Sequence, residues 1–204
     1  YGLGAYAIFS WVQSLKPRDL PTYRLIWGTP IVVMLAVAFG SLSFVTYATA
    51  FWIPHYVEQT FYGGALEPAR YIAGMTAKEE VGSIIGWTAA VSAAIGVIGG
   101  GYLSDLWRQR DPRGRLFIIM ISCAAPLPIV AVLLTTDSLP LFYWLHPFAH
   151  MFASAWVGAA VATLQDLVLP RMRPTAGATS ILGTTMVGLA LGPYTAGKMA
   201  DVLQ

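Results

Sequence analysis

The sequence predicts an all-α membrane protein, a polytopic bundle of five transmembrane helices. Of its 204 residues, 56% are hydrophobic and 11% are charged, whereas soluble domains carry about 25% charged residues. The charge is also unevenly placed, because five windows longer than about 20 residues contain no Asp, Glu, Lys or Arg and each can cross a hydrocarbon core as a helix. These observations exclude a soluble enzyme domain and a disordered chain, and the net charge of +2 gives no indication of a nucleic-acid partner.

The charge-free windows give the expected spans in order. They cover about 30–54, 81–104, 116–136, 138–165 and 174–197. Residues 1–29 form a cytoplasmic or interfacial segment, since the apolar run 1–15 is too short for a full span; it is either an interfacial helix or the end of a truncated one. Because the chain begins with Tyr1, we expect it to be a piece of a longer protein.

Basic residues in the short loops predict the orientation. Nine lie on one side of the five spans and three on the other, so the first side is expected to be cytoplasmic. The nine are Lys16, Arg18, Arg24, Arg108, Arg110, Arg113, Arg115, Arg171 and Arg173, and the three are Arg70, Lys78 and Lys198. The loop 55–80, with its Gly63-Gly64 pair, Glu67 and Pro68, is then outside. The chain is expected to be a multi-pass protein of the cell or inner membrane.

The outer loop ends in a helix start. Thr76 followed by Glu79 suits a capping box that opens the second span. The acids there, Glu79 and Glu80, are expected to be a solvated cap of the helix.

The turn between the second and third spans carries the clearest motif. Gly101-x-Leu103-Ser104-Asp105 is followed by an arginine-rich stretch that includes Arg108 and Arg113. Glycine at a helix end permits close helix packing, and an acid at the membrane edge can pair with an arginine or with helix amides. Such a cluster can hold two helices in one conformation and release them in another.

This motif resembles the G-x-L-(A/S)-D loop of the major facilitator superfamily, in its longer second copy between helices 8 and 9. A second resemblance, to spinster-like transporters, covers roughly 20–201. It rests on Leu164-Gln165-Asp166-Leu167-Val168-Leu169-Pro170, on Arg173-Pro174-Thr175-Ala176, and on Gly192-Pro193 with Gly197 and Asp201. Pro174 departs from the family pattern, which has alanine there.

The resemblance implies that the five spans are helices 7 to 11, with helix 12 and the N-terminal half-bundle missing. It also implies an amphipathic lipid substrate, such as a lysophospholipid or sphingosine phosphate, or an organic anion, and a lipid bilayer as environment. The resemblance also implies that transport is either coupled to protons, as symport, or uncoupled, as uniport. The residues credited with proton coupling in this family would lie in the missing half.

A polar residue inside a span is costly, so it is expected to have a hydrogen-bond partner or a functional role. His146, His150 and Ser154 share one helix face, which either lines a polar cavity, as a substrate site, or makes hydrogen bonds within the bundle; His146 could also be exposed in an outer vestibule. A metal site is disfavoured because three histidines and one cysteine offer too few ligands.

On the first span, Gly40, Phe44, Tyr47 and Phe51 fall at helical spacing. They form either an aromatic packing stripe or an amphipathic substrate wall with the tyrosine hydroxyl as its polar group. Gly96-x-x-x-Gly100 and Gly188-x-x-x-Gly192-Pro193 predict close helix crossings, and the Gly-Pro pair can also weaken the helix as a gate. Asp166 could pair with Arg171, Arg173 or the arginines 108–115.

The sequence therefore predicts a secondary transporter that works by alternating access, with an amphipathic lipid or organic anion as substrate and without a cofactor. One alternative is a major facilitator drug or organic anion carrier. Another is a five-span intramembrane metal enzyme using His146 and His150, and a third is a half-size structural or regulatory membrane protein. The chain contains neither a nucleophile motif nor a phosphate-binding loop.

Overall fold

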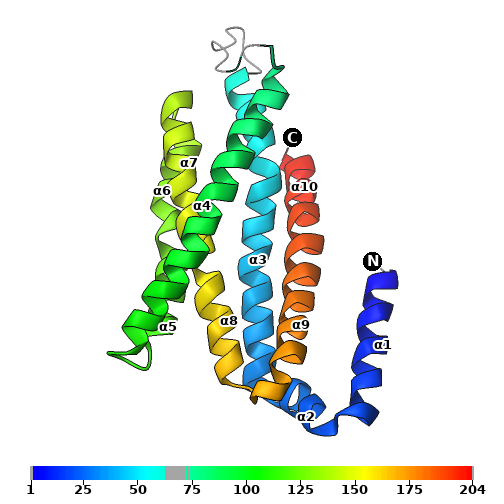
Figure 1. The fold of residues 1–204 in the computed structure, drawn as a ribbon. Coiled ribbons are helices and arrows are strands. Elements are labelled where there is room, and N and C mark those ends of the chain that lie inside the picture. Colours follow the sequence, from blue (N-terminus) through cyan, green and yellow to red (C-terminus); the bar gives the residue numbers. More distant parts are fainter. Residues whose placement is uncertain (1, 63–71, 73, 204) are drawn as a thin grey trace. The chain divides into compact units, whose positions relative to one another are not determined.

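The computed structural model describes residues 2–62, 72 and 74–203, and these form helices without any strand (Figure 1). Five helical segments are long and apolar enough to cross a membrane: Val32–Tyr62, Lys78–Arg108, Gly114–Thr135, Leu139–Leu167 and Pro170–Lys198. The chain is thus a multi-pass membrane protein, and the predicted five-span all-α fold is confirmed. Part of the outer loop predicted between the first two spans, residues 63–71 and 73 with Glu67 and Arg70, lies outside the described residues.

The chain divides into two compact units. One comprises Tyr1–Ala48 with Thr163–Gln204 and the other Thr49–Ala162. The first unit contains α1 (Gly2–Arg18), α2 (Leu20–Gly28), the 3-10 turn η2 (Pro170–Met172), α9 (Arg173–Gly183), the π-helical segment η3 (Thr184–Leu191) and α10 (Gly192–Leu203). The second contains the π-helical turn η1 (Glu58–Tyr62), α4 (Ala77–Arg108), α5 (Gly114–Ala124), α6 (Pro126–Thr135) and α7 (Leu139–Ser154). The helices α3 (Pro30–Val57) and α8 (Trp156–Asp166) contribute residues to both.

Helix starts follow local chemistry. Thr76 caps α4, and Glu79 completes the predicted capping box by accepting from the Thr76 backbone N–H at 2.9 Å. Asp19 caps α2 by accepting from the hydroxyl of Thr22 at 2.5 Å and from its backbone N–H at 3.2 Å. These two hydrogen bonds hold the pKa of Asp19 below its usual value, and the bond from the hydroxyl has the larger effect.

Two of the spans are interrupted, which the charge pattern did not predict. The third breaks into α5 and α6 at Ala125, immediately before Pro126, because proline lacks the amide that would continue the helical ladder. The fourth breaks into α7 and α8 at Ala155. In the fifth, the π-helical η3 precedes the Gly192-Pro193 pair, at the place where local weakening of the helix was expected.

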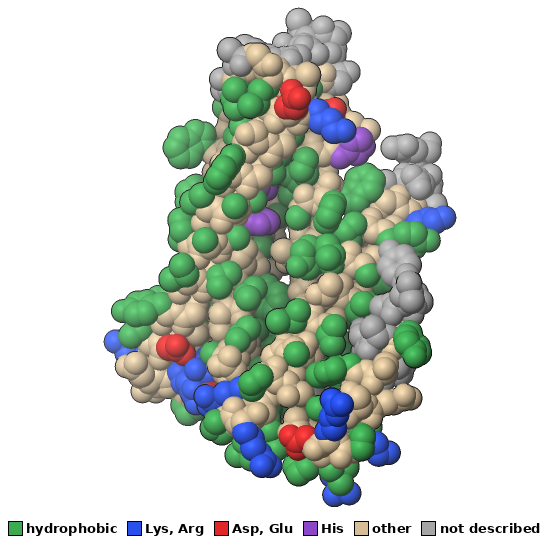
Figure 2. Space-filling model, turned by 45° about the vertical axis from the view of Figure 1, so that its right-hand side comes forward, with side chains coloured by type: hydrophobic (Ala, Val, Ile, Leu, Met, Phe, Trp, Pro, Cys, Tyr) green, Lys and Arg blue, Asp and Glu red, His purple; other side chains and the backbone are tan. Residues whose placement is uncertain are grey.

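Outward-facing side chains are apolar over the middle of the helices. Trp87, Val91, Ile95 and Ile98 of α4 are all exposed, as a lipid-immersed or bundle-facing surface requires. Figure 2 shows hydrophobic side chains along the visible helices and charged ones near helix ends. Within the second unit, Val57, Leu133 and Phe142 are almost completely buried and form the core with their neighbours.

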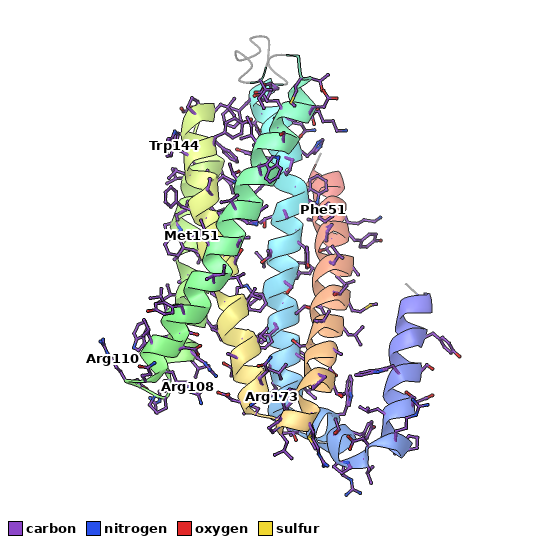
Figure 3. All side chains as sticks on the ribbon, viewed as in Figure 1. Phe51, Arg108, Arg110, Trp144, Met151 and Arg173 are labelled. Atoms are coloured by element: carbon purple, nitrogen blue, oxygen red, sulfur yellow. The ribbon has the colours of Figure 1, made fainter. Side chains whose placement is uncertain are left out.

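Glycines permit the closest helix crossing in the second unit. A Cβ at Gly96 would overlap the backbone carbonyl of Met151, and one at Gly100 would overlap that of Ala155. A Cβ at Gly158 would lie 2.9 Å from the Cα of Gly101. Helix α4 therefore crosses α7 and α8 backbone to backbone (Figure 3 labels Met151 at this crossing), as the small-residue spacing predicts.

The adjacent glycines Gly99 and Gly100 give a matched test of this crossing. A Gly100→Ala variant forces the helices apart and should lower the free energy of unfolding by about 1–3 kcal/mol. Gly99→Ala should not, because a Cβ there meets nothing within 4 Å. The measurement is the thermal unfolding midpoint of the purified protein in detergent; equal midpoints for the two variants would contradict the close crossing.

Candidate functional site

The predicted acid–arginine pair forms at the arginine-rich end of the second unit. Asp105, in the last turn of α4, accepts from Arg115 at the start of α5, with 2.9 Å between Oδ1 and Nη2 and 3.3 Å between Oδ1 and Nε. The Arg115 side chain is 12% exposed and that of Asp105 59%, so the carboxylate sits at the surface while the guanidinium is held against the protein. The pair links two helices across a short turn.

The turn itself depends on a glycine. A Cβ at Gly114 would lie 2.6 Å from the backbone of Trp107 and Arg108, so only glycine lets α5 start this close to the end of α4. The Arg113 amide donates to Asp111 Oδ1 at 2.8 Å, which shapes the turn locally. Gly101, expected to act with this motif, faces the close approach of Gly158 instead. Figure 3 shows Arg108 and Arg110 at this end of α4.

In the first unit, the polar turn between α8 and α9 is held by an arginine. Arg173 Nε donates to the backbone carbonyl of Gln165 at 3.2 Å, beside Asp166, and thereby ties the start of α9 to the end of α8 (Figure 3 labels Arg173). Gly192, next to Pro193, faces α3, where a Cβ would come 2.6 Å from the Phe44 carbonyl oxygen. The predicted close crossing at this glycine is confirmed, whereas the gating roles of these residues stay predictions.

The histidine face of α7 lies inside the second unit. His146 is 3% exposed, and its ring stacks on Phe142 at 6.2 Å and on His150 at 5.7 Å between centroids. Ser154 donates to the His150 backbone carbonyl at 2.8 Å, so its hydroxyl is used within the helix. The expectation that His146 could be exposed in a vestibule is wrong, because the side chain is buried inside the second unit.

The Nδ1 atom of His146 is buried and has no hydrogen-bond partner among the described residues. The expected helix–helix hydrogen bond is therefore not made by this atom. A buried polar atom without a partner costs about 1–3 kcal/mol, and polar groups inside a membrane span are expensive in general. The atom is thus available to a further hydrogen-bond donor or acceptor.

The aromatic series on α3 divides between the two units. Gly40, Phe44 and Tyr47 belong to the first, and Phe51 to the second. In the first unit the ring of Tyr47 packs against Gly188, where a Cβ would lie 3.1 Å from its Cδ2, which supports the packing interpretation for this tyrosine. Phe51 is 60% exposed and projects from α3 (Figure 3).

Sequence reasoning missed a buried polar cluster in the second unit, at the end of α4 opposite Asp105. Glu80 is 0% exposed, so the expectation of a solvated cap is wrong for this residue, although Glu79 is exposed as expected. Glu80 Oε1 accepts from the Tyr62 hydroxyl at 3.0 Å, and Glu80 Oε2 accepts from the Ile72 amide at 3.0 Å. The Tyr62 hydroxyl lies 3.4 Å from that of Tyr143 on α7. The feature of the sequence that could have indicated this burial is the position of Glu80 directly before the apolar Val81.

Each unit also carries an apolar groove. In the second unit a groove of about 400 Å³ lies between α4 and α7, lined by residues that include Trp87, Ile95 and Met151. In the first a groove of about 200 Å³ is lined by residues that include Trp27, Val37 and Met186. Within the part of the chain that the structure describes, no group of three or more His, Cys, Asp or Glu side chains could hold a metal ion, so nothing supports the metal-enzyme alternative.

Comparisons with known proteins agree with this architecture. No family model matches the chain. It is 27% identical to an MFS-type efflux pump of Mycolicibacterium smegmatis over 61% of the chain and 29% of that protein. It is 26% identical to spinster homolog 1 of Xenopus tropicalis over 100% of the chain and 41% of that protein.

A solved structure shares the fold. It is the crystal structure of a bacterial homologue of the human lysosomal transporter spinster, in an inward-facing and unoccupied conformation. The TM-score is 0.72 and the identity 22%, over 90% of this chain and 36% of that one. The chain is thus similar in sequence to spinster homologues and to an MFS-type efflux pump, and similar in fold to a bacterial spinster homologue. It spans less than half the length of these relatives.

In this spinster-like chain, the buried Nδ1 of His146, which has no partner among the described residues, is expected to lower the free energy of unfolding. His146→Phe keeps the stack on Phe142 and removes the unsatisfied atom, so the free energy of unfolding should stay level or rise, by up to about 1–3 kcal/mol. His146→Ala should instead lower it by about 2–5 kcal/mol through the cavity it leaves. Thermal unfolding in detergent measures both variants; a loss with phenylalanine as large as with alanine would show that Nδ1 has a partner.

Proposed function

We propose that this chain is most of one helix bundle of a secondary active transporter, which moves an amphipathic lipid across the membrane by alternating access. The observation that carries the proposal is the likeness of the fold to an inward-facing spinster homologue over 90% of the chain. In alternating access, two bundles rock around a central site and expose it to each side in turn. The partner bundle is the N-terminal half that the family resemblance implies.

The lipid assignment rests on the combination of apolar surface with isolated polar groups. An acyl chain needs an apolar groove, and each unit has one. A polar head group needs hydrogen-bonding atoms inside the membrane, and His146 offers a buried Nδ1 without a described partner. In this proposal the substrate contacts come from Phe44, Tyr47, Phe51, His146, His150 and Ser154. Protons are proposed as a coupled ion, by analogy with the family.

The gating assignment rests on the two arginine-rich turns and on the interrupted fifth span. At the turn of the second unit and in the end of α4 that leads into it, the proposed residues are Gly101, Asp105, Arg108 and Arg113. In the first unit they are Asp166 and Arg173 at the turn between α8 and α9, and Gly192 and Pro193 at the start of α10. The pair of Asp105 with Arg115 supports a latch, because a surface ion pair of modest strength can form in one state and open in another.

A second candidate is a carrier of drugs or organic anions, and the similarity to an MFS-type efflux pump favours it. The two candidates differ in the substrate, because a lipid partitions into the membrane whereas a water-soluble anion does not.

Uptake into vesicles tests the substrate class. The complete transporter containing this chain, reconstituted into lipid vesicles, should accumulate labelled lysophospholipid well above empty vesicles. A water-soluble organic anion serves as the competing substrate. If the anion is taken up and lysophospholipid uptake equals that of empty vesicles, the lipid assignment is wrong and the anion carrier is favoured.

The latch predicts the behaviour of an Asp105→Asn variant. Losing the charge weakens the contact with Arg115 and should shift the balance of inward- and outward-facing states by up to about fivefold, the effect of ~1 kcal/mol. The fold should stay intact. Labelling of cysteines placed on both membrane sides measures the balance, with Asp137→Asn as a control that also removes one loop acid. Unchanged labelling in Asp105→Asn would disprove the latch.

A further inference from the structure

A buried cluster at the start of α4 connects η1, α4 and α7, because the Glu80 carboxylate accepts from Tyr62 and the Tyr62 hydroxyl lies beside that of Tyr143. We call it the Glu80 clamp, formed by the Glu80 side chain, the hydroxyls of Tyr62 and Tyr143, and the Ile72 amide. Tyr62 ends η1, Glu80 lies in the first turn of α4, and Tyr143 lies in α7. Both carboxylate oxygens are used, one by Tyr62 and the other by Ile72, each at 3.0 Å.

The burial of this carboxylate makes its hydrogen bonds matter. Glu80 is 0% exposed and Tyr62 6% exposed, so water cannot replace a lost partner. A buried polar group whose partner is removed keeps its full desolvation cost, whereas an exposed one does not. The neighbouring Glu79 shows the contrast, because it is exposed and serves only the capping box with Thr76.

The clamp is placed to control the position of α7. Tyr62 and Tyr143 approach within 3.4 Å, and Tyr143 precedes His146 by one helical turn. Phe142, beside Tyr143, contacts Phe61 from η1 and stacks on His146. A movement of the η1 end of α3 relative to α4 must therefore break the clamp or carry the histidine face of α7 with it.

Helix α4 thus carries a polar tie at each end. Glu80 and Asp105 are 25 residues apart, which corresponds to about 38 Å along a helix and so to the two surfaces of a membrane. The Asp105–Arg115 pair is open to water at the acid, whereas the clamp is closed. The clamp is therefore the stronger tie per hydrogen bond.

We propose that Glu80 is a positioning residue that holds the ends of α3, α4 and α7 in one arrangement, and that releasing it is a step in the conformational cycle. The release step rests on the proposed transport function, while the closed arrangement rests on the structure of the second unit alone. Glu80 does not contact substrate in this proposal; it acts through Tyr62 and Tyr143 on the histidine face.

Cysteine labelling tests the closed arrangement without any transport assay. In a cysteine-free background of the complete protein, which includes Cys123→Ala, Val57→Cys places a thiol at a position that is 0% exposed in the core next to the clamp. Adding Glu80→Gln or Tyr62→Phe should raise the rate of labelling by a water-soluble maleimide by about tenfold, the effect of losing one buried hydrogen bond. Tyr62→Phe removes only a hydroxyl, so it decides the matter where Glu80→Gln fails to fold.

Two controls separate local release from other effects. Glu79→Gln removes the same charge one residue earlier and preserves the capping box, so it should leave the labelling of the thiol at position 57 unchanged. Ser104→Cys places a thiol that is also at a 0% exposed position but at the other end of α4, and it should label slowly in every variant. Equal labelling at position 57 in Glu80→Gln and Glu79→Gln, or faster labelling at both positions 57 and 104, would overturn the clamp.

Transport by the same variants tests the release step. Glu80→Gln and Tyr62→Phe should each change Vmax per folded molecule by about tenfold and leave KM within about twofold, and the double variant should do no more than either single one. Faster labelling at position 57 with unchanged Vmax would overturn the release step while leaving the closed arrangement in place. Wild-type vesicles without any uptake would instead refute the proposed function, and the labelling would still decide the clamp.

Discussion

The close crossing of α4 with α7 and α8 is the constraint on which the second unit depends. Inside hydrocarbon there is little hydrophobic drive between helices, so association relies on close packing. Gly96, Gly100 and Gly158 supply it by letting backbone meet backbone. Because this crossing fixes the register of α4 against α7, it also decides which α7 side chains turn inward, and the histidines are among them. A polar group can then be buried only where the crossing leaves it enclosed.

Charge in the second unit follows from the same constraint. A helix that spans a membrane can hold ionisable groups cheaply only at its ends, and α4 has Glu80 near one end and Asp105 near the other. The two acids are stabilised differently. Asp105 stays at the surface beside Arg115, while Glu80 is buried and accepts a hydrogen bond on each carboxylate oxygen. An enclosed acid responds to movement of its partners more steeply than an exposed one, since water cannot take their place.

The sequence predicted what depends on residue type and spacing, and missed what depends on tertiary contact. Charge-free windows located the spans, Thr76 and Glu79 located a helix start, and the glycine spacing predicted the crossings. By contrast, the burial of Glu80 depends on Tyr62 and Tyr143, which are 18 and 63 residues away along the chain, and no periodicity shows that they meet. The ring contacts of His146 with Phe142 and His150 follow the i, i+4 spacing along α7, whereas the burial of His146 depends on how α7 packs against the neighbouring helices.

The interruptions in the helices indicate where each unit can change shape. A break at Ala125 precedes Pro126, a break at Ala155 lies opposite Gly100, and η3 runs into Gly192-Pro193. π-helical turns and prolines loosen the backbone ladder, yet two of these three places are also sites of backbone contact with a neighbouring helix. A bend there cannot occur alone, because it must carry the contacting helix with it. Loosened ladders at tight contacts therefore favour a few discrete arrangements over continuous flexing, and the proposed alternating access requires such behaviour.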